Sequence, residues 1–406
     1  MVSPPYDQFN PELEKIFFAK SPFNIAHLIL PKPEGLKTPS GVEGDSWQPY
    51  EEIRSHLAGW LADKVIVPDE KSGIYVYQIT FREGGRERQN LGFFALGKLE
   101  EYLERGVAPH ENILAAPRED RLKLRISTQA DFGPVYLLYR DPEKDFENLA
   151  ASVVSLPPLA EIKDMYGELH QLWGLPDSSQ VKSVTSKLSA CSVLIADGHH
   201  RYDAALESYR RNPDKPWFAY RMMAFFNSEG GGLSIRPIHR IISGLKFSGR
   251  ELLGRLSENF EIETVYAGGS VNDFEKAMNR LGEAADRFHR IGVLMEDIFY
   301  LASTPRTEFL DVEILDRWVF KNALGLSDEE ALQFVDYSKD AGEVRRLVGE
   351  GKAGAGFILS PIRVDEIWKK VEQGEKLPPK STFFYPKLLT GLVMNINSEF
   401  YKYNDD

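Results

Sequence analysis

The sequence predicts an α+β fold in which mixed sheets are flanked by helices, and three observations favour it. Short apolar or alternating runs, which are typical of strands, occur along the whole chain of 406 residues. Two of these runs, 74–82 and 89–96, flank Glu83-Gly84-Gly85 and therefore predict a hairpin. Elsewhere, strands and helices alternate without the regular order of βαβ units, which favours the α+β class.

We expect the chain to divide into three regions, 1–145, 146–248 and 249–406. The first boundary falls in a segment that begins at Asp141-Pro142 and ends at Pro157-Pro158. In chain order, the first region predicts a strand at 24–30, a loop at 31–49, a helix at 50–63, the hairpin, a charged helix at 118–128 and a strand at 134–139.

The other two regions continue the mixture of helices and strands. The second predicts helices at 177–188 and 199–211, a buried strand at 192–196, and strands at 218–226 and 234–242. The third predicts helices near 250–259, 270–285, 311–324, 341–349 and 364–373, a strand at 354–359, and a closing segment rich in proline, lysine and aromatic residues.

Composition and charge exclude several classes of protein. The 49 Lys and Arg residues face 61 Asp and Glu residues, which gives a net charge of −12. Sequence-independent binding to nucleic acid depends on Lys and Arg neutralising phosphates, so this balance argues against a nucleic-acid partner and leaves room for a small anionic ligand. The N-terminus lacks the pattern of a signal peptide, and no run reaches the roughly 18 apolar residues of a membrane span. We therefore expect a soluble protein with a small-molecule substrate and no membrane partner, and the oligomeric state stays open.

The chain has one cysteine, Cys191, so no disulfide can form within it. This predicts a reducing, cytoplasmic compartment. Cys191 adjoins an apolar strand, which favours a buried, inert thiol over a reactive one, because burial in apolar surroundings raises the pKa of a thiol.

The sharpest local feature is Asp197-Gly198-His199-His200-Arg201, where an apolar strand runs through a glycine turn directly into a helix. Both histidines and Arg201 would lie in the first turn, where unpaired backbone N–H groups and the helix dipole attract an anion. Arg201 can bind phosphate through two hydrogen bonds, and each imidazole can donate a hydrogen bond or a proton. Asp197 can cap the helix or hold a metal or an ammonium group. The alternative is a capped helix whose histidines satisfy local hydrogen bonds; a shared zinc ion is disfavoured because adjacent side chains point about 100° apart.

A segment near the N-terminus carries two polar candidates. Two prolines stiffen residues 4–7, so the segment is either a rigid entry to the fold or a loop that presents Tyr6 and Asp7 to a substrate. A carboxylate beside a substrate hydroxyl can accept its proton, as general-base catalysis requires.

The region before the central motif adds a second pair. His110 and Glu111 lie in a predicted loop, where they either orient a ligand as acid and base or form an ordinary surface pair. The charged helix at 118–128 predicts a solvated face, with Arg121 as the candidate for reaching inward.

Two later segments are candidates for holding phosphate. On a strand, Arg236 and Arg240 would share one face and His239 would lie on the other, with a proline marking an edge or an end of the strand. The two arginines would either clamp a phosphate or carboxylate or protect an exposed edge. In the closing segment the candidates are Lys380, Ser381, Thr382 and Lys387. This segment lacks the glycines of a phosphate loop, and its aromatic rings would cover a nucleobase or plug the core.

Ordered segments resemble the signature of the domain of unknown function 1015 family along nearly the whole chain. They are Pro4-Pro5-Tyr6-Asp7 with Pro22-Phe23-Asn24, His110-Glu111 with Asp120-Arg121-Leu122, the residues 196–202, Arg236-Pro237-Ile238-His239-Arg240, and the residues 378–387. The resemblance identifies a family and leaves the function open, because the family is named for lacking one.

The turn at 197–201 also resembles, more distantly, the strand–turn–helix core of the ParB and sulfiredoxin-like superfamily, which includes kinases that phosphorylate free serine. The resemblance implies a nucleotide-binding core in which Gly198, His199, His200 and Arg201 contact phosphate. It also implies that Asp197 faces the substrate or Mg²⁺, and that ATP or ADP with Mg²⁺ is the cofactor. An earlier acidic residue would act as base, with Asp7 and Glu111 as the candidates.

Three function hypotheses follow. The first is a nucleotide-dependent phosphotransferase, a kinase acting on a small hydroxylated metabolite such as free serine. Its catalytic candidates are Asp7, Glu111, Asp197 and His200, and its substrate-binding candidates are Tyr6, Asn24, His110 and Arg121. The second is a nucleotide-gated regulatory protein of ParB type without turnover, and the third is a metal-dependent hydrolase whose ligands the sequence does not assemble.

Overall fold

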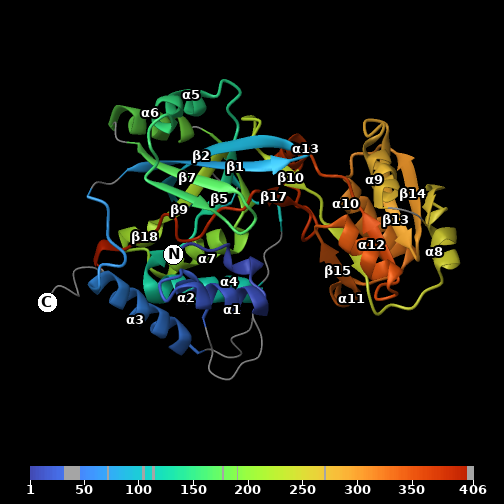
Figure 1. Cartoon of the computed structure of the whole chain (residues 1–406), viewed down its shortest axis with the longest axis horizontal. Coiled ribbons are helices and arrows are strands. Elements are labelled where there is room, and N and C mark those ends of the chain that lie inside the picture. Colours follow the sequence, from blue (N-terminus) through green and yellow to red (C-terminus); the bar gives the residue numbers. More distant parts are fainter. Residues whose placement is uncertain are drawn as a thin grey trace. The chain divides into compact units, whose positions relative to one another are not determined.

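The computed structural model describes residues 1–31, 46–70, 73–102, 106–111, 115–175, 178–189, 191–268 and 271–399. Most of the predicted loop at 31–49, and the predicted helix start at 177, lie outside these residues. The chain forms two compact units (Figure 1). Unit 1 comprises Met1–Ser234 and Pro386–Asp406, and unit 2 comprises Ile235–Tyr385.

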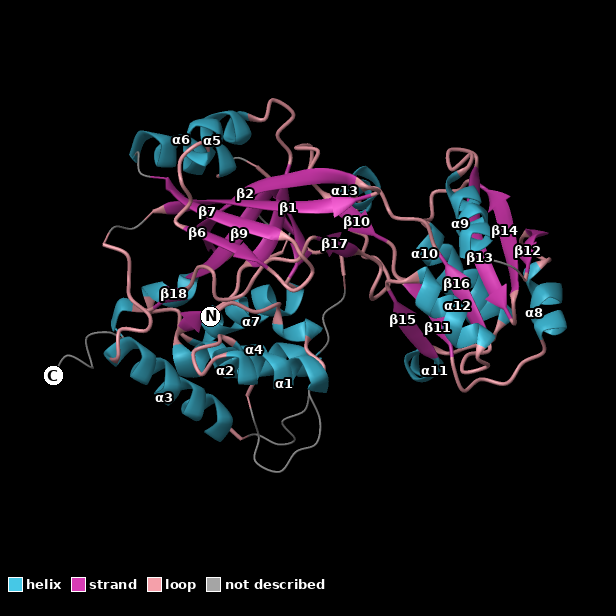
Figure 2. Ribbon diagram, viewed as in Figure 1, coloured by secondary structure: helices cyan, strands magenta, loops and turns pink. Residues whose placement is uncertain are grey.

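Unit 1 is built on a mixed eight-stranded sheet with the order β3-β8-β5-β9-β2-β1-β7-β6 (Figure 2). Its strands are β1 (Ile74–Glu83), β2 (Arg86–Lys98), β3 (Val107–Ala108), β5 (Val135–Tyr139), β6 (Ala160–Lys163), β7 (Leu169–Leu175), β8 (Val193–Asp197) and β9 (Tyr220–Asn227). The predicted hairpin is present as β1 and β2, and Gly84 and Gly85 supply the positive φ angles of +56° and +77° that its turn needs. The pairs β3–β8 and β5–β9 are parallel, and the other neighbours are antiparallel.

Helices cover this sheet, and Figure 1 shows α5 and α6 on the side of the strands opposite α3 and α4. The helices of unit 1 are η1 (Tyr6–Gln8), α1 (Pro11–Lys20), α2 (Ala26–Ile29), α3 (Gln48–Ala62), α4 (Ala115–Thr128), α5 (Asp145–Val154), α6 (Ser178–Leu188), α7 (His199–Arg211) and η2 (Pro216–Ala219). A two-stranded sheet joins β4 (Ala130–Asp131) to β18 (Asn395–Ile396). One core packs Phe93, Val135 and Ile195 of the large sheet against α5, α6 and α7, and a second core lies among α2, α3 and α4.

The strand predicted at 24–30 is wrong, because the short helix α2 lies there instead. Ile25, Ala26 and Leu28 are fully buried and His27 is half-buried, so most of this segment faces the core. A short apolar run of this kind does not distinguish a strand from a buried helical turn. Asn24 favours the helical turn here, because its Oδ1 accepts a hydrogen bond from the backbone N–H of Ala26 at 3.0 Å.

Unit 2 contains a six-stranded sheet with the order β12-β14-β13-β16-β11-β15. Its strands are β11 (His239–Ile242), β12 (Glu261–Ala267), β13 (Phe288–Met295), β14 (Ile298–Pro305), β15 (Val335–Ser338) and β16 (Ala355–Ile358). Its helices are α8 (Gly249–Leu256), α9 (Val271–Asn279), η3 (Arg280–Gly282), α10 (Asp311–Ile314), the π-helical η4 (Leu315–Ala323), α11 (Asp328–Phe334), α12 (Ala341–Gly349) and α13 (Val364–Glu372).

The strand predicted at 234–242 is divided into two strands that belong to different sheets. β10 (Ser234–Arg236) pairs with β17 (Phe383–Tyr385), whereas β11 lies between β15 and β16. Pro237 separates them, because proline has no N–H to donate to a sheet. The sequence pattern predicted that Arg236 and Arg240 share one strand face. They do not, because they lie on different strands.

The grouping into two units differs from the predicted division into 1–145, 146–248 and 249–406. Strands β8 and β9 from the second predicted region pair with strands from the first, and residues 386–406 return to the same unit. These pairings join distant segments, which local sequence patterns do not reveal. In the described part of the chain, no helix has both the length and the apolar character required to cross a membrane.

Candidate functional site

Two loops in unit 1 meet because the strands before them are parallel neighbours. Val107 and Ala108 of β3 pair with Val193 and Leu194 of β8. His110 and Glu111 follow the first strand, and Gly198 and His199 follow the second. The carboxyl ends of neighbouring parallel strands lie at the same edge of a sheet, which is where α/β proteins commonly bind ligands.

Gly198 makes the turn between β8 and α7. Its φ of +91° is in the left-handed region that side chains disfavour, and a Cβ atom there would lie 2.9 Å from Nε of Arg201. Gly198 offers no side chain to cap α7, so the N–H groups of the first turn are not capped by it. The predicted strand–turn–helix is thus present, and its glycine also makes room for Arg201.

His110 and His199 form a buried pair at the meeting point of the two loops. The His110 main-chain N–H donates to Nε2 of His199 at 3.3 Å, and Nδ1 of His110 lies 2.7 Å from the carbonyl oxygen of Ile195. The rings meet edge to face with centroids 4.6 Å apart. Burial lowers the pKa of His110 and lowers that of His199 well below its usual value, with the mutual repulsion of the two rings adding to the second shift. Both rings are therefore neutral near pH 7, with Nδ1 of each carrying the proton.

Asp197 connects this site to Lys387, which lies in the C-terminal part of unit 1. Its Oδ2 contacts Nη2 of Arg201 at 2.5 Å, and its Oδ1 contacts Nζ of Lys387. Burial opposes ionisation, but Lys387 and Arg201 hold the pKa of Asp197 well below its usual range. The predicted residues Asp197, Arg201 and Lys387 are therefore brought together as one ionic network.

A cavity of about 40 Å³ adjoins Arg201 and is rich in arginine. A single water needs roughly 10–15 Å³ on a comparable measure, so the space suits a few waters or a small oxyanion. The polar residues that line it are Tyr6, Arg121, Arg125, Arg201, Arg221 and Thr390. All four arginines are at least nine-tenths buried.

Carboxylates balance these arginines only in part. Asp120 contacts Arg121, and Oδ1 of Asp131 contacts Nη1 of both Arg125 and Arg221. Among the described residues joined by these contacts, with Lys387 and Asp197 counted as well, five cationic side chains meet three carboxylates, which is an excess of two positive charges in a largely buried region.

Two of the cavity arginines show the effect of burying positive charge, one in its pKa and both in their hydrogen bonding. Burial lowers the pKa of Arg221 to about 10; Asp131 opposes the shift, while Arg125 and Arg201 add to it. Nε of Arg201 and Nε of Arg221 are buried and have no hydrogen-bond partner among the described residues. Because buried donors are rarely left unpaired, this cavity has the properties of an anion site.

The N-terminal candidates divide between the cavity and the surface. Tyr6 lines the cavity, and its ring lies under the guanidinium of Arg121, with 4.0 Å between Cζ and the ring centroid. Burial raises the pKa of Tyr6 to about 12. Asp7 is exposed, and Asn24 is fully buried with its side chain bound to backbone groups of Val2 and Ala26.

The remaining candidates of unit 1 lie at the start of α7 and beside it. Glu111 is half-buried, with Oε1 3.9 Å from Nε2 of His110, and His200 is half-buried on the first turn of α7. Cys191 is half-buried, and burial raises the pKa of its thiol, which favours the inert thiol over the reactive one.

Six predicted phosphate contacts belong to unit 2 and are described separately. Arg236 stacks on the ring of Tyr385 at 3.2 Å, and Arg240 binds the carbonyl oxygen of Lys380 at 3.1 Å. His239 Nδ1 accepts from the N–H of Leu359 at 3.3 Å, and burial lowers its pKa to about 4. The other three residues differ in burial. Lys380 is exposed and Thr382 is half-buried, whereas Ser381 is buried and its hydroxyl donates to the carbonyl oxygen of Pro378 at 2.5 Å.

Sequence reasoning missed the residues that complete the cavity. The pattern at 118–128 predicts a solvated face from which Arg121 alone reaches inward. Arg121 is 7% exposed, but Lys123 and Arg125 on the same helix are also buried, at 5% and 2% exposed. Arg121 and Arg125 are four residues apart and so share a helix face, a signal that would have placed them together. Asp131 and Arg221 are drawn in by long-range packing, for which the sequence carries no local signal.

Comparison with solved structures finds distant likenesses. A free serine kinase in complex with AMP is 16% identical, with 72% of this chain and 86% of that chain covered and a TM-score of 0.37. A conserved hypothetical protein from Pyrococcus furiosus is 15% identical, with coverage of 72% and 90% and a TM-score of 0.36. SbnI from Staphylococcus aureus, truncated at its C-terminus, is 11% identical, with coverage of 73% and 85% and a TM-score of 0.34.

No curated protein matches the sequence. The family model described as "Protein of unknown function (DUF1015)" matches residues 1–318. This match spans all of the described site in unit 1 except Lys387 and Thr390. The chain therefore belongs to the DUF1015 family.

Proposed function

We propose that unit 1 binds a nucleotide through its phosphates and transfers a phosphoryl group to a small hydroxylated metabolite, with free serine as the first acceptor to test. The observation that carries the proposal is the buried excess of positive charge in the arginine cavity beside the start of α7. Phosphoryl transfer depends mainly on positioning and on electrostatic stabilisation of phosphate oxygens. A preformed cationic cavity supplies both.

The start of α7 and the cavity share Arg201. Its guanidinium lines the cavity, and it lies in the turn that follows Gly198. A phosphate placed there would accept from the first-turn N–H groups and from the cavity arginines, and His200 would lie on its solvent side. Such an anion would also neutralise the uncompensated charge.

Glu111 is the residue that we assign as general base. Asp197 is a poor proton acceptor, because Lys387 and Arg201 hold its pKa well below the usual range against the effect of burial. Asp7 is exposed on η1, whereas Glu111 follows β3 at the edge where the two loops meet. His110 lies beside this carboxylate, with 3.9 Å between its Nε2 and Oε1 of Glu111.

ATP or ADP would enter with Mg²⁺, which neutralises phosphate charge when bound. Proteins hold Mg²⁺ through one or two carboxylates together with the substrate phosphates. Asp197 does not fit this role, because each of its oxygens already contacts a cation. We therefore assign no protein ligand to Mg²⁺ at this site.

The first test is nucleotide binding, measured by calorimetry with ADP and with ATP. Replacing Arg221 by Gln removes one cavity cation, and we expect affinity to fall by about ten- to a hundredfold, the effect of losing one charge-assisted hydrogen bond. Arg210→Gln is the matched control, because Arg210 lies at the far end of α7 and contacts Glu101 on the surface. Absence of binding to the wild-type chain overturns the proposal.

The second test is turnover, followed by phosphorus NMR with ATP or ADP, Mg²⁺ and a panel of hydroxylated metabolites that includes serine. We expect Glu111→Gln to lower the rate by at least about a hundredfold while nucleotide affinity stays the same. Asp7→Asn is the comparison, and we expect it to keep its activity. Nucleotide binding without transfer to any acceptor would reject the phosphotransferase and favour a nucleotide-gated binding protein.

A further inference from the structure

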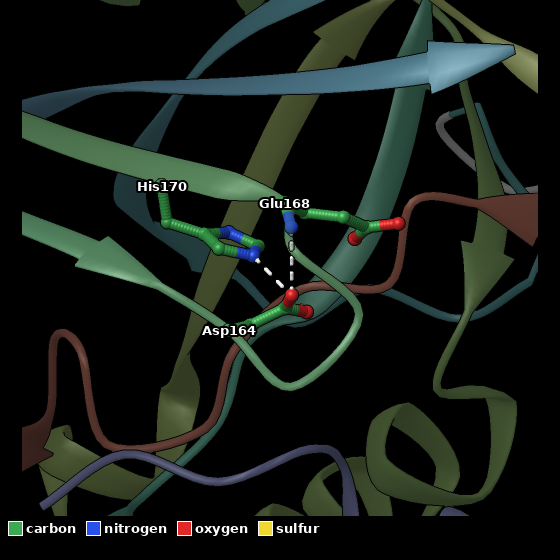
Figure 3. A group of neighbouring side chains, drawn as sticks. All are labelled: Asp164, Glu168 and His170. Carbon is green, nitrogen blue, oxygen red and sulfur yellow. Dashed lines mark hydrogen bonds and ion pairs between the residues drawn. The ribbon is translucent and has the colours of Figure 1, made fainter.

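A second cluster of ligand-type side chains lies in unit 1 at the hairpin formed by β6 and β7. Asp164 is in the loop that joins the strands, and Glu168 and His170 lie at its end and on β7 (Figure 3). Each residue offers one donor atom, and the three atoms lie within 4.8 Å of one another. None of these residues belongs to the site described above.

His170 is fully buried and held from one side. Its Nδ1 lies 2.6 Å from the hydroxyl of Tyr77, which fixes the orientation of the ring. Its Nε2 is also buried and has no hydrogen-bond partner among the described residues; Oδ2 of Asp164 lies 3.5 Å away, at the distance of a long ion pair. A buried ring nitrogen without a hydrogen bond is costly, so this atom points to a missing ligand.

Asp164 is equally well oriented. Its Oδ1 accepts from the backbone N–H groups of Tyr166 and Glu168, each at 2.9 Å. Figure 3 shows the carboxylate turned toward the imidazole, which places Oδ2 beside Nε2. Glu168 is 4% exposed, so a second carboxylate lies in the same low-dielectric region.

We propose that Asp164, Glu168 and His170 bind one divalent transition-metal ion, with Zn²⁺ as the probe. Two carboxylates and one imidazole are ligands that first-row divalent ions accept, and a 2+ ion would balance both negative charges. Ligand atoms of a tetrahedral zinc ion lie roughly 3.3 Å apart, so modest side-chain rotation from the observed spacing completes the site. Three protein ligands leave the fourth position for water.

In such a metal site, the hydrogen bond between His170 and Tyr77 would hold the imidazole ring in place. A histidine that binds metal through Nε2 usually donates its other N–H to a partner that fixes the ring. The competing explanation is a simple ion pair between protonated His170 and Asp164, with no metal.

Calorimetry with Zn²⁺ on the untagged full chain, after treatment with a chelator, separates these explanations. We expect one ion per chain and a higher melting temperature in its presence. Glu168→Gln should weaken zinc affinity at least about tenfold, and Tyr77→Phe, which keeps its ring in the core, by about ten- to a hundredfold. Glu161→Gln is the matched control, because Glu161 lies on β6 of the same hairpin and is exposed.

Two outcomes overturn the proposal. One is a wild-type chain that takes up no zinc and shows no change in melting temperature. The other is uptake that Glu168→Gln and Tyr77→Phe leave unchanged, which would place the ion elsewhere. If Glu168→Gln does not fold, the comparison of Tyr77→Phe with Glu161→Gln decides the question. Nucleotide binding is measured separately, so failure here leaves the proposed function untouched.

Discussion

The ammonium group of Lys387 contacts Oδ1 of Asp197, a residue 190 positions earlier in the chain. This contact brings the segment that re-enters unit 1 at Pro386 to the turn between β8 and α7. Both side chains are about 15% exposed, so the ion pair is poorly screened by water. Asp197 is thereby held as a carboxylate that organises cations instead of accepting protons.

Replacing Lys387 by Met keeps the aliphatic stem and removes the charge. We expect the free energy of unfolding of unit 1 to fall by about 2 kcal/mol, less than for a fully orphaned buried charge because Arg201 still contacts Asp197. Chemical denaturation measures this change. Lys15→Met, at an exposed position of α1, is the control and should differ little from wild type. Equal effects of the two substitutions would show that the ion pair contributes nothing.

Asp131 is the anion that holds two cavity arginines together, so its removal should be more severe. Asp131→Asn leaves the guanidinium groups of Arg125 and Arg221 without their shared carboxylate in a buried region. We expect a loss of about 3–5 kcal/mol in unfolding free energy, and a larger stabilisation by added phosphate than wild type shows.

The control for this substitution is Glu101→Gln, which breaks a solvent-exposed pair with Arg210. Such pairs contribute about 0–1 kcal/mol. Denaturation curves with and without phosphate give both quantities. A phosphate response no larger in Asp131→Asn than in wild type would contradict the assignment of the cavity as an anion site.

Local features of this fold were predictable and distant contacts were not. The β1–β2 hairpin and the turn at Gly198 are encoded within a few residues, by glycines that permit positive φ and by apolar runs beside them. The cavity, in contrast, is completed by Arg125, Asp131 and Arg221. These residues lie in different elements, and only the folded chain brings them together.

The closing segment illustrates the same limit. Residues 378–387 look like one phosphate-binding unit in the sequence, yet the chain passes from unit 2 to unit 1 between Tyr385 and Pro386. Lys387 consequently lies with Asp197, whereas Lys380 and Ser381 belong to unit 2. Composition indicated the chemistry of the segment, and only long-range packing decides which site each residue joins.

Gly198 should tolerate no side chain, for two independent reasons. A φ of +91° costs about 1–3 kcal/mol for a residue with a Cβ atom, and that atom would lie 2.9 Å from Nε of Arg201. We therefore expect Gly198→Ala to destabilise unit 1 by about 2–3 kcal/mol and to weaken anion binding by displacing Arg201. Gly59→Ala on α3 is the control, since a Cβ there meets nothing within 4 Å, and a small gain in stability is expected.

The buried histidines predict how stability depends on pH. Burial lowers the pKa of His110 and, more strongly, of His199. In the unfolded chain these side chains take up protons near pH 6.5, whereas the folded chain resists protonation until lower pH. The unfolded state therefore binds more protons in this window, and stability must fall as the pH drops from 7 to 5.

The two buried aspartates of the site do not obscure this effect, because the pKa of Asp131 and that of Asp197 are lowered and their contributions disappear only below about pH 4. His199→Gln retains an acceptor for the His110 N–H but cannot take up a proton, so its stability should fall less steeply between pH 7 and 5 than that of wild type. His56→Gln, at an exposed position on α3, should keep the wild-type slope. Denaturation midpoints at a series of pH values measure the three slopes, and a slope in His199→Gln as steep as in wild type would mean that His199 is readily protonated in the folded chain. That result would also remove the neutral His110–His199 pair from the candidate site, so the pH series tests the geometry of the site as well as its stability.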